Sequence, residues 1–189
     1  MSEHDSPVHI RLDGEVLVVR IDNPPVNALR QAVRAGLQEA VERLEQDAAA
    51  RAMLIVGQGK AFIAGADIRE FGKPPLAPFL PDVLNRMEAA AKLVVAAIHG
   101  PALGGGLEVA MATHYRVALA SAKLGLPEVT LGLLPGAGGT QRSPRLMGAI
   151  PAAELMLSGK HLGADVALAA GLVDKLAEGD DPLAAGLAY

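Results

Sequence analysis

A buried-strand pattern that runs directly into a glycine turn is the feature that most constrains this sequence. Residues 93–98 form an uninterrupted apolar run, and residues 109–112 have the composition of a helix. Between them lie three consecutive glycines, Gly104 to Gly106, followed closely by Glu108. Glycine lets a backbone approach a ligand, and a helix beginning at such a turn leaves N–H donors unpaired. The stretch therefore predicts an anion or oxyanion site with a carboxylate one turn away.

The segments around this turn alternate between strand and helix patterns. Strand patterns occupy residues 8–12, 16–21, 53–56, 93–98, 115–120 and 173–176. Helical spacing occupies residues 29–44, 84–91, 151–157 and 164–170. The first two strands flank an Asp-Gly turn and predict a hairpin, and Arg34 falls on a face of the first helix other than its apolar one. This order indicates a mixed α/β domain.

Length, charge and cysteine content bound the possible functions. A chain of 189 residues can form one domain with a sizeable core, so we expect a single core domain over residues 1–189. Its net charge of −4 gives no reason to expect a nucleic-acid partner. The absence of cysteine excludes thiol catalysis and disulfides. The polar start and the lack of a long apolar run predict neither a signal peptide nor a membrane partner, so we expect a cytoplasmic protein.

Two glutamates and one loop of small residues are candidate chemical groups. Glu128 follows Pro127, twenty positions after Glu108. Taken alone, each glutamate is also typical of the first turn of a helix, where the helix dipole favours acidic side chains. The loop at 60–68 is built of small residues, which suits backbone approaching a bound acyl group. A tight strand-to-helix connection with Asp67 in the first helical turn explains the same loop equally well.

A second glycine-rich loop, residues 131–140, precedes another predicted helix. It lacks the lysine of a phosphate-binding P-loop and the glycine spacing of a dinucleotide site, so it does not predict nucleotide binding. His99, His114 and His161 have no spacing typical of a metal site, and we expect each to be structural. Accordingly, no metal ligands are predicted.

Three stretches in this order resemble the enoyl-CoA hydratase/isomerase (crotonase) superfamily. They are Ala61-Phe62-Ile63-Ala64-Gly65-Ala66-Asp67-Ile68, Ala102-Leu103-Gly104-Gly105-Gly106-Leu107-Glu108-Val109-Ala110, and Pro127-Glu128 through Pro135-Gly136-Ala137-Gly138-Gly139-Thr140-Gln141-Arg142. The likeness covers nearly the whole chain. Asn23-Pro24-Pro25-Val26-Asn27-Ala28-Leu29 is most similar to the hydratase part of multifunctional fatty-acid β-oxidation proteins.

This resemblance implies a fold and a site. The implied fold is a spiral of ββα units forming two roughly perpendicular sheets flanked by helices. The implied catalytic residues are Glu108 and Glu128, and the backbone N–H groups of Ala66 and Gly105 would form the oxyanion hole. The remaining positions expected to contact an acyl-CoA substrate are Val26, Ala28, Ala64, Asp67, Ile68, Leu103, Gly104, Pro127 and Leu131. Among the basic residues, Lys60, Arg69 and Lys73 are expected to be solvated or to meet CoA phosphates.

The implied reaction is hydration of a 2-trans-enoyl-CoA to a 3-hydroxyacyl-CoA. Adding water builds negative charge on the thioester oxygen, which two fixed N–H donors would stabilise. The family assigns water activation to Glu108 and proton exchange at C2 to Glu128, and we expect their titrations to be coupled. No cofactor is required, because coenzyme A is part of the substrate.

Two other functions fit the same residues. An enoyl-CoA isomerase would move a proton between C2 and C4 instead of adding water, and retention of both glutamates favours hydration. A non-catalytic acyl-CoA-binding module would bind the thioester without turnover. Assaying both products, and binding without loss of the enoyl thioester, would separate these possibilities.

The resemblance also implies features outside the glycine turn. Family members that stand alone form trimers or trimer pairs and carry a further helical region, so we expect this chain to be a fragment of a longer protein. Residues 182–189 predict the start of a helix without a polar cap, and therefore exposed apolar surface near the C-terminus. We expect the irregular segment 71–81 to form the pocket wall that sets acyl chain length.

Overall fold

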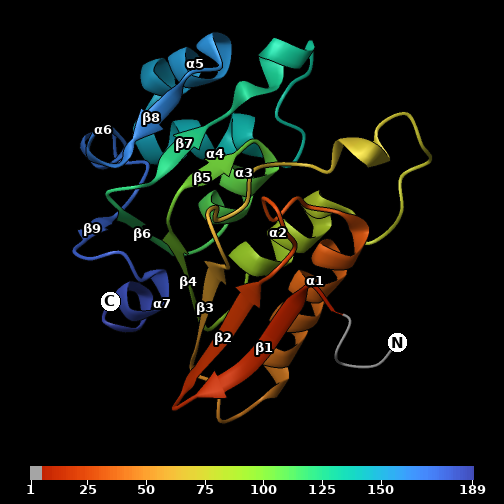
Figure 1. The fold of residues 1–189 in the computed structure, drawn as a ribbon, viewed down its shortest axis with the longest axis vertical. Helices are drawn as coiled ribbons and strands as arrows, with labels where there is room; N and C mark the ends of the chain where they lie inside the picture. The colour runs from red at the N-terminus through yellow and green to blue at the C-terminus, as the bar shows by residue number, and fades with distance from the viewer. Residues whose placement is uncertain (1–5) are drawn as a thin grey trace.

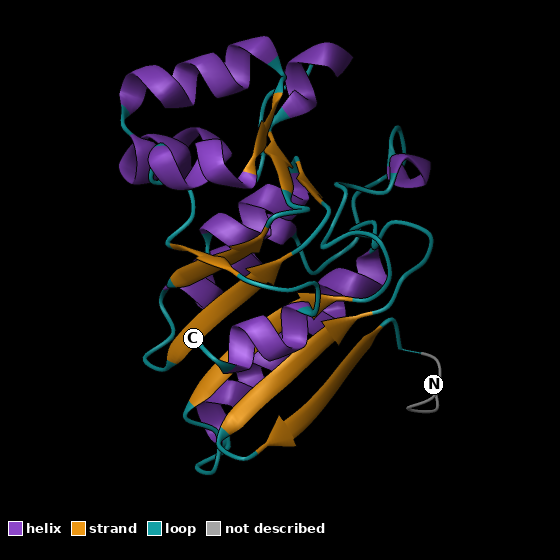
Figure 2. Ribbon diagram, turned by 60° about the vertical axis from the view of Figure 1, so that its left-hand side comes forward, coloured by secondary structure: helices purple, strands orange, loops and turns teal. Residues whose placement is uncertain are grey.

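The computed structural model describes residues 6–189, which form two β-sheets flanked by helices (Figures 1 and 2). The larger sheet has the order β1-β2-β3-β4-β6-β9, and the smaller has the order β5-β7-β8. The strands are β1 (Val8–Asp13), β2 (Val16–Ile21), β3 (Ala52–Gly57), β4 (Leu93–Ile98), β5 (Pro101–Leu103), β6 (Tyr115–Leu119), β7 (Lys123–Gly125), β8 (His161–Gly163) and β9 (Lys175–Ala177). After the antiparallel β1–β2 hairpin, every pairing in the larger sheet is parallel.

Helices cover both faces of the larger sheet. The α-helices are α1 (Gln31–Gln46), α2 (Leu80–Glu88), α3 (Gly105–Met111), α4 (Gly139–Met147), α5 (Ala149–Ser158), α6 (Ala164–Ala169) and α7 (Pro182–Leu187). Two 3₁₀ turns, η2 (Ile68–Glu70) and η3 (Pro127–Leu131), connect the core elements. The chain of contacts α1–α2–α3–α4 builds one helical layer, whereas α7 packs on β3, β4 and β6. Within residues 6–189, no helix is long and apolar enough to cross a membrane.

Alternating side chains of the central strands define two cores. Leu17 and Val19 of β2 are fully buried together with Val33 and Leu37 of α1. Side chains of the opposite parity, such as Leu54 on β3, join a smaller apolar cluster to which α7 contributes Leu183. Because neighbouring strand residues point to opposite faces, both faces of the sheet are covered. This is why the parallel strands read as continuous apolar runs.

Most predicted helices and strands are present, and the differences concern mainly where an element begins or ends. The hairpin and the strand 93–98 have the predicted bounds, to within one residue. Leu29 is not helical but bridges to Ala66, and α1 begins two residues later. Pro81, predicted to break structure, lies in the first turn of α2, where its missing N–H costs no hydrogen bond. The last strand is β9, two residues later than predicted, and β8 was not predicted because it has only three residues.

The C-terminal helix corrects one expectation. The side chain of Asp181 accepts a hydrogen bond from the backbone N–H of Leu183 at 2.9 Å, so α7 has the polar cap that was expected to be missing. Leu183 packs against the sheet, and the Tyr189 ring lies 5.5 Å from that of Tyr115. Exposed apolar surface remains at Leu187, which is 42% exposed.

Candidate active site

The glycine turn lies where the smaller sheet meets α3. β5 ends at Leu103, and Gly104 then adopts a φ of 51°, which favours glycine. The N–H of Gly104 donates to Gly125 O in β7 at 2.9 Å, and Gly104 O accepts from Glu108 N at 3.0 Å to start the helix. A Cβ at Gly106 would lie 2.0 Å from Ile63 O, so only glycine permits this approach. The predicted strand–turn–helix is therefore present, with a short strand added before the turn.

The loop that carries Ala66 runs beside this turn. Leu103 N donates to Ile63 O at 3.0 Å, and a Cβ at Gly65 would lie 3.3 Å from Leu103 O. Gly65 O accepts from Leu29 N at 2.9 Å, which fixes the loop from its other side. Within residues 6–189, the N–H groups of Ala66 and Gly105 have no hydrogen-bond acceptor. The structure thus brings both predicted oxyanion donors to adjacent backbone segments and leaves them unpaired.

Glu108 is 3% exposed and is held by the second glycine-rich loop. Its Oε1 accepts hydrogen bonds from the backbone N–H groups of Ala137 at 2.7 Å and Gly139 at 2.8 Å. Burial raises the pKa of Glu108 above its ordinary value, against the opposing effects of these two donors and the charge of Arg142. No residue among 6–189 donates to Oε2. One carboxylate oxygen is fixed, and the other is left for a reacting group.

Glu128 sits in η3 on the other side of the turn. A Cβ at Gly104 would lie 3.1 Å from its Oε1, whereas a Cβ at Gly105 would lie 4.0 Å from Oε2 of Glu108. Both carboxylates therefore face the same two-residue turn. Burial raises the pKa of Glu128, and the charge of Glu108 raises it further. Its Oε2 is buried without a hydrogen-bond partner, which is unusual for a carboxylate unless a ligand or proton completes it.

The other predicted contact residues fall into three groups. Ala64 N donates to Val26 O at 3.0 Å, so the segment containing Val26 and Ala28 lies along the Ala66 loop. Leu103, Gly104 and Pro127 belong to the turn and to the start of η3. Ile68 and Leu131, by contrast, are 72% and 64% exposed, so most of each residue is open to solvent.

Asp67 is occupied by a neighbouring arginine. The guanidinium of Arg69 binds its carboxylate at 2.6 Å, and Asp67 also caps η2 by accepting from Arg69 N. Hydrogen bonding to Arg69 lowers the pKa of Asp67 to about 2. The structure therefore gives Asp67 the loop-ordering role that the sequence left open.

Sequence reasoning missed three residues that shape this region. Asn27 donates its amide to Gln58 O, Ala61 O and Phe62 O at 2.8–3.2 Å, which ties the Val26 segment to the start of the Ala66 loop. Arg142 spans Ala137 O and the carboxylate of Glu88. Arg34, assigned to a polar face, is only 9% exposed. Asn27 and Arg142 lie inside the quoted motifs, but their partners are distant in sequence, so spacing alone did not identify them.

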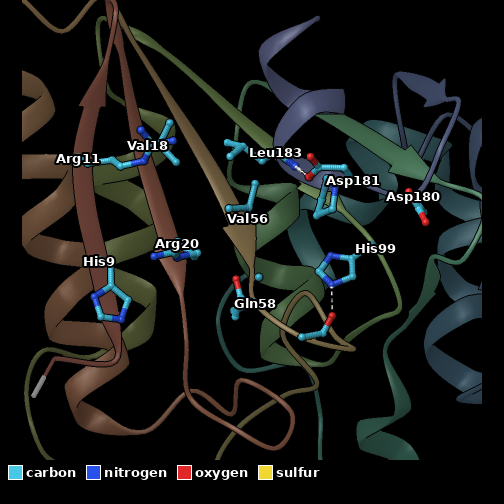
Figure 3. A pocket seen from close by; sticks show the side chains of 13 residues that line it. His9, Arg11, Val18, Arg20, Val56, Gln58, His99, Asp180, Asp181 and Leu183 are labelled. Atoms are coloured by element: carbon cyan, nitrogen blue, oxygen red, sulfur yellow. Dashed lines mark hydrogen bonds between the residues drawn. The ribbon is translucent and has the colours of Figure 1, made fainter.

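A separate cavity lies away from the turn, on the opposite face of the sheet (Figure 3). It measures about 410 Å³, and its lining includes Val18 of β2 and Leu183 of α7. His99 Nε2 lies 3.0 Å from Gly59 O and must donate to it, since a carbonyl only accepts. That bond gives His99 a structural contact. Neither glutamate lines this cavity, so the turn remains the candidate active site. Among residues 6–189, no three His, Asp or Glu residues are grouped to hold a metal ion.

Comparisons with known proteins identify the family to which this chain is similar. The family model described as enoyl-CoA hydratase/isomerase matches residues 11–183. A peroxisomal bifunctional enzyme of Danio rerio is 51% identical over 163 residues, which are 86% of this chain and 23% of that protein. A probable enoyl-CoA hydratase of Bacillus subtilis (strain 168) is 44% identical over 173 residues, covering 88% of this chain and 67% of that protein.

A solved enoyl-CoA hydratase from Mycobacterium tuberculosis H37Rv superimposes with a TM-score of 0.91 at 34% identity, covering 97% of this chain and 74% of that one. The chain thus spans about a quarter of the bifunctional relatives and about two thirds of the bacterial hydratase. With its two sheets, its glycine turn and these similarities, the chain belongs to the enoyl-CoA hydratase/isomerase family, close to the hydratase part of multifunctional enzymes.

Proposed function

We propose that this chain catalyses the hydration of 2-trans-enoyl-CoA to 3-hydroxyacyl-CoA in fatty-acid β-oxidation. The observation that carries the proposal is the pair of carboxylates at one turn. Glu108 and Glu128 each keep one oxygen without a protein donor, beside two unpaired backbone N–H groups. The names of the bifunctional and hydratase relatives support the same reaction.

The chemistry assigns each group a separate task. Ionised Glu108, fixed through Oε1, takes a proton from water through Oε2 as the water oxygen bonds to C3. The charge that develops on the thioester oxygen is stabilised by the N–H groups of Ala66 and Gly105. Protonated Glu128 then gives its proton to C2, which completes the addition of water. Its Oε2, which is buried without a hydrogen-bond partner, can carry that proton. This scheme needs no cofactor beyond the coenzyme A of the substrate.

The test is a product assay on the isolated chain. Incubation with crotonyl-CoA should remove the ultraviolet absorbance of the conjugated thioester and yield 3-hydroxybutyryl-CoA, identified by mass spectrometry. A mass increase of one water distinguishes hydration from isomerisation, which leaves the mass unchanged. Tight CoA-ester binding with no loss of absorbance would instead support a binding module and overturn the proposal.

We further infer that this chain works as part of a homo-oligomer or of a larger β-oxidation protein. An apolar cavity of about 870 Å³ lies along α5 and α6, and Ile150 and Leu157 beside it are 75% and 76% exposed. Such apolar exposure is typical of an interface. The solution mass, measured by sedimentation at several concentrations, tests this, and a monomer at all concentrations would contradict it for the chain alone.

A further inference from the structure

A cavity of about 320 Å³ opens beside the Ala66 loop, and the segment between η2 and α2 forms a large part of its wall. We call it the acyl-side cavity; its apolar lining includes Leu29, Phe71, Leu76, Phe79 and Leu80. Figure 1 shows this segment, in yellow, extending away from the sheets before it returns to α2. The cavity meets the glycine turn, since a Cβ at Gly105 would lie 2.9 Å from Leu29 Cδ1 and 3.2 Å from Leu80 Cδ2.

The wall has almost no regular structure of its own. Between Glu70 and Leu80 there is no helix or strand. Its backbone carbonyls at Leu76, Ala77 and Pro78 accept hydrogen bonds from side chains of α1 instead. A segment held in this way keeps its shape only while those donors stay in place.

One side chain supplies most of these bonds. The guanidinium of Arg34 donates to Leu76 O, Pro78 O and Leu29 O, each at 2.9 Å, and to Glu70 Oε2 at 2.7 Å. It thereby joins α1 to Glu70 and Pro78, near the two ends of the irregular segment, and to Leu29, which forms a β-bridge with Ala66. Only arginine presents enough fixed donors for four such partners. The bond from Gln31 N to Glu70 Oε1, at 2.7 Å, secures the same carboxylate from the start of α1.

We propose that Arg34 is a positioning residue that fixes the wall of the acyl-side cavity and thereby sets which acyl chains the enzyme accepts. This inference rests on the proposed hydratase function. The volume corresponds to roughly ten groups the size of a water molecule, at about 30 Å³ each. That is room for an acyl chain of medium length beyond the reacting carbons. Each methylene that the wall buries should raise kcat/KM about fourfold.

The experiment compares kcat/KM for crotonyl-CoA, octenoyl-CoA and hexadecenoyl-CoA. The parent should favour octenoyl-CoA. In Arg34→Ala, the ratio of octenoyl-CoA to crotonyl-CoA should fall by about tenfold, mainly through KM, because the longer chain loses a fixed wall. In Arg34→Lys, this ratio should lie between those of the parent and Arg34→Ala, since an ammonium group cannot bind all four acceptors. Arg86→Ala is the matched control: Arg86 also bridges helices, binding Glu42 and Glu45 of α1 at 2.7 Å, but does not line the cavity.

The outcomes separate the two proposals. No hydration of any substrate by the parent would overturn the proposed function. Hydration by the parent with an unchanged chain-length ratio in Arg34→Ala would overturn the role of Arg34 alone. If Arg34→Ala does not fold, Glu70→Gln replaces it: this variant weakens the same network and should lower the ratio by a few fold, and an unchanged ratio would again overturn the inference.

Discussion

Two glycine turns each precede a helix in this protein, α3 in one case and α4 in the other. The backbone N–H groups of the two turns differ in whether they have a hydrogen-bond acceptor. At the start of α4, the N–H groups of Ala137 and Gly139 bind the internal carboxylate of Glu108. At the start of α3, the N–H of Gly105 has no acceptor among residues 6–189. The same local feature therefore fixes the side chain of Glu108 in one place and leaves a backbone donor unpaired in the other. A helix N-terminus is a potential anion site. Only the surrounding structure shows whether the anion is a side chain of the same protein or a ligand.

The largest expected effect comes from the carboxylates that the two turns bring together. Glu108→Gln and Glu128→Gln should each lower hydration by about 10²–10⁴-fold, because each carboxyl group handles one proton transfer. CoA-ester binding should change little in either variant. Stopped-flow hydration rates and binding titrations measure both. Near-parental turnover in either variant would remove that glutamate from the mechanism.

A side chain at the α3 turn should cost more activity than one at the α4 turn. Gly105→Val should lower kcat about 10²–10³-fold, since the added atoms crowd Leu29, Leu80 and the thioester oxygen. Gly136→Val is the matched control, because a Cβ there meets nothing closer than Leu134 O at 4.0 Å. Equal kinetics for the two variants would show that the α3 turn has no special role.

Within the turn before α4, a substitution at Gly139, whose N–H binds Glu108, should have a larger effect than one at Gly136. A Cβ at Gly139 would lie 3.0 Å from Glu108 Oε1 and 2.8 Å from Pro135 Cβ. Gly139→Ala should therefore displace the carboxylate, lowering kcat about tenfold and the free energy of unfolding by about 1–3 kcal/mol. Gly136→Ala should change neither quantity. Urea denaturation and initial rates on both variants decide whether the turn positions Glu108.

The smallest expected effect is on the pH dependence of stability. Burial raises the pKa of both glutamates above 4.5, their ordinary value. Between the unfolded pKa and the folded pKa, the folded state therefore binds more protons than the unfolded state. Their contribution to the free energy of unfolding is therefore fully present below the unfolded pKa and is lost as pH rises through the folded pKa. Glu128→Gln should flatten this decline. Urea midpoints from about pH 4 to about pH 8 measure it, and an unchanged slope would contradict the burial of a titrating Glu128.

Local patterns predicted the fold well, and distant partners explain the failures. The hairpin, the strand before the glycine turn and the helix after it follow from alternation and glycine placement within a few residues. Arg34 lies off the apolar face of the first helix, so helical spacing predicts that its side chain is exposed to solvent. The side chain is buried instead, because it binds acceptors up to 44 residues away in the sequence. The cap supplied by Asp181 is local, since its side chain accepts from Leu183 N two residues away, but the sequence pattern predicted the start of this helix from Pro182 alone.

Family resemblance, and not spacing, grouped Glu108 and Glu128 with the backbone of Ala66 and Gly105, and their catalytic roles stay a prediction. In the structure both carboxylates face the Gly104–Gly105 turn, and the Ala66 loop runs beside it. The residues that support this arrangement were not predicted. The donors that orient Glu108 lie 29 and 31 residues further along the chain. The α4 turn was predicted as a glycine loop without nucleotide chemistry, but its actual ligand, a side chain of the same protein, depends on tertiary structure.

In the proposed mechanism, Gly105 and Ala66 keep their N–H groups for the thioester oxygen. A crystal structure of the chain with acetoacetyl-CoA bound would reveal this contact. The thioester oxygen should lie about 2.7–3.1 Å from both nitrogen atoms, with Glu108 still bound by Ala137 and Gly139. A thioester oxygen beyond hydrogen-bonding distance of Gly105 N, or one that displaces Glu108 from the α4 turn, would contradict it.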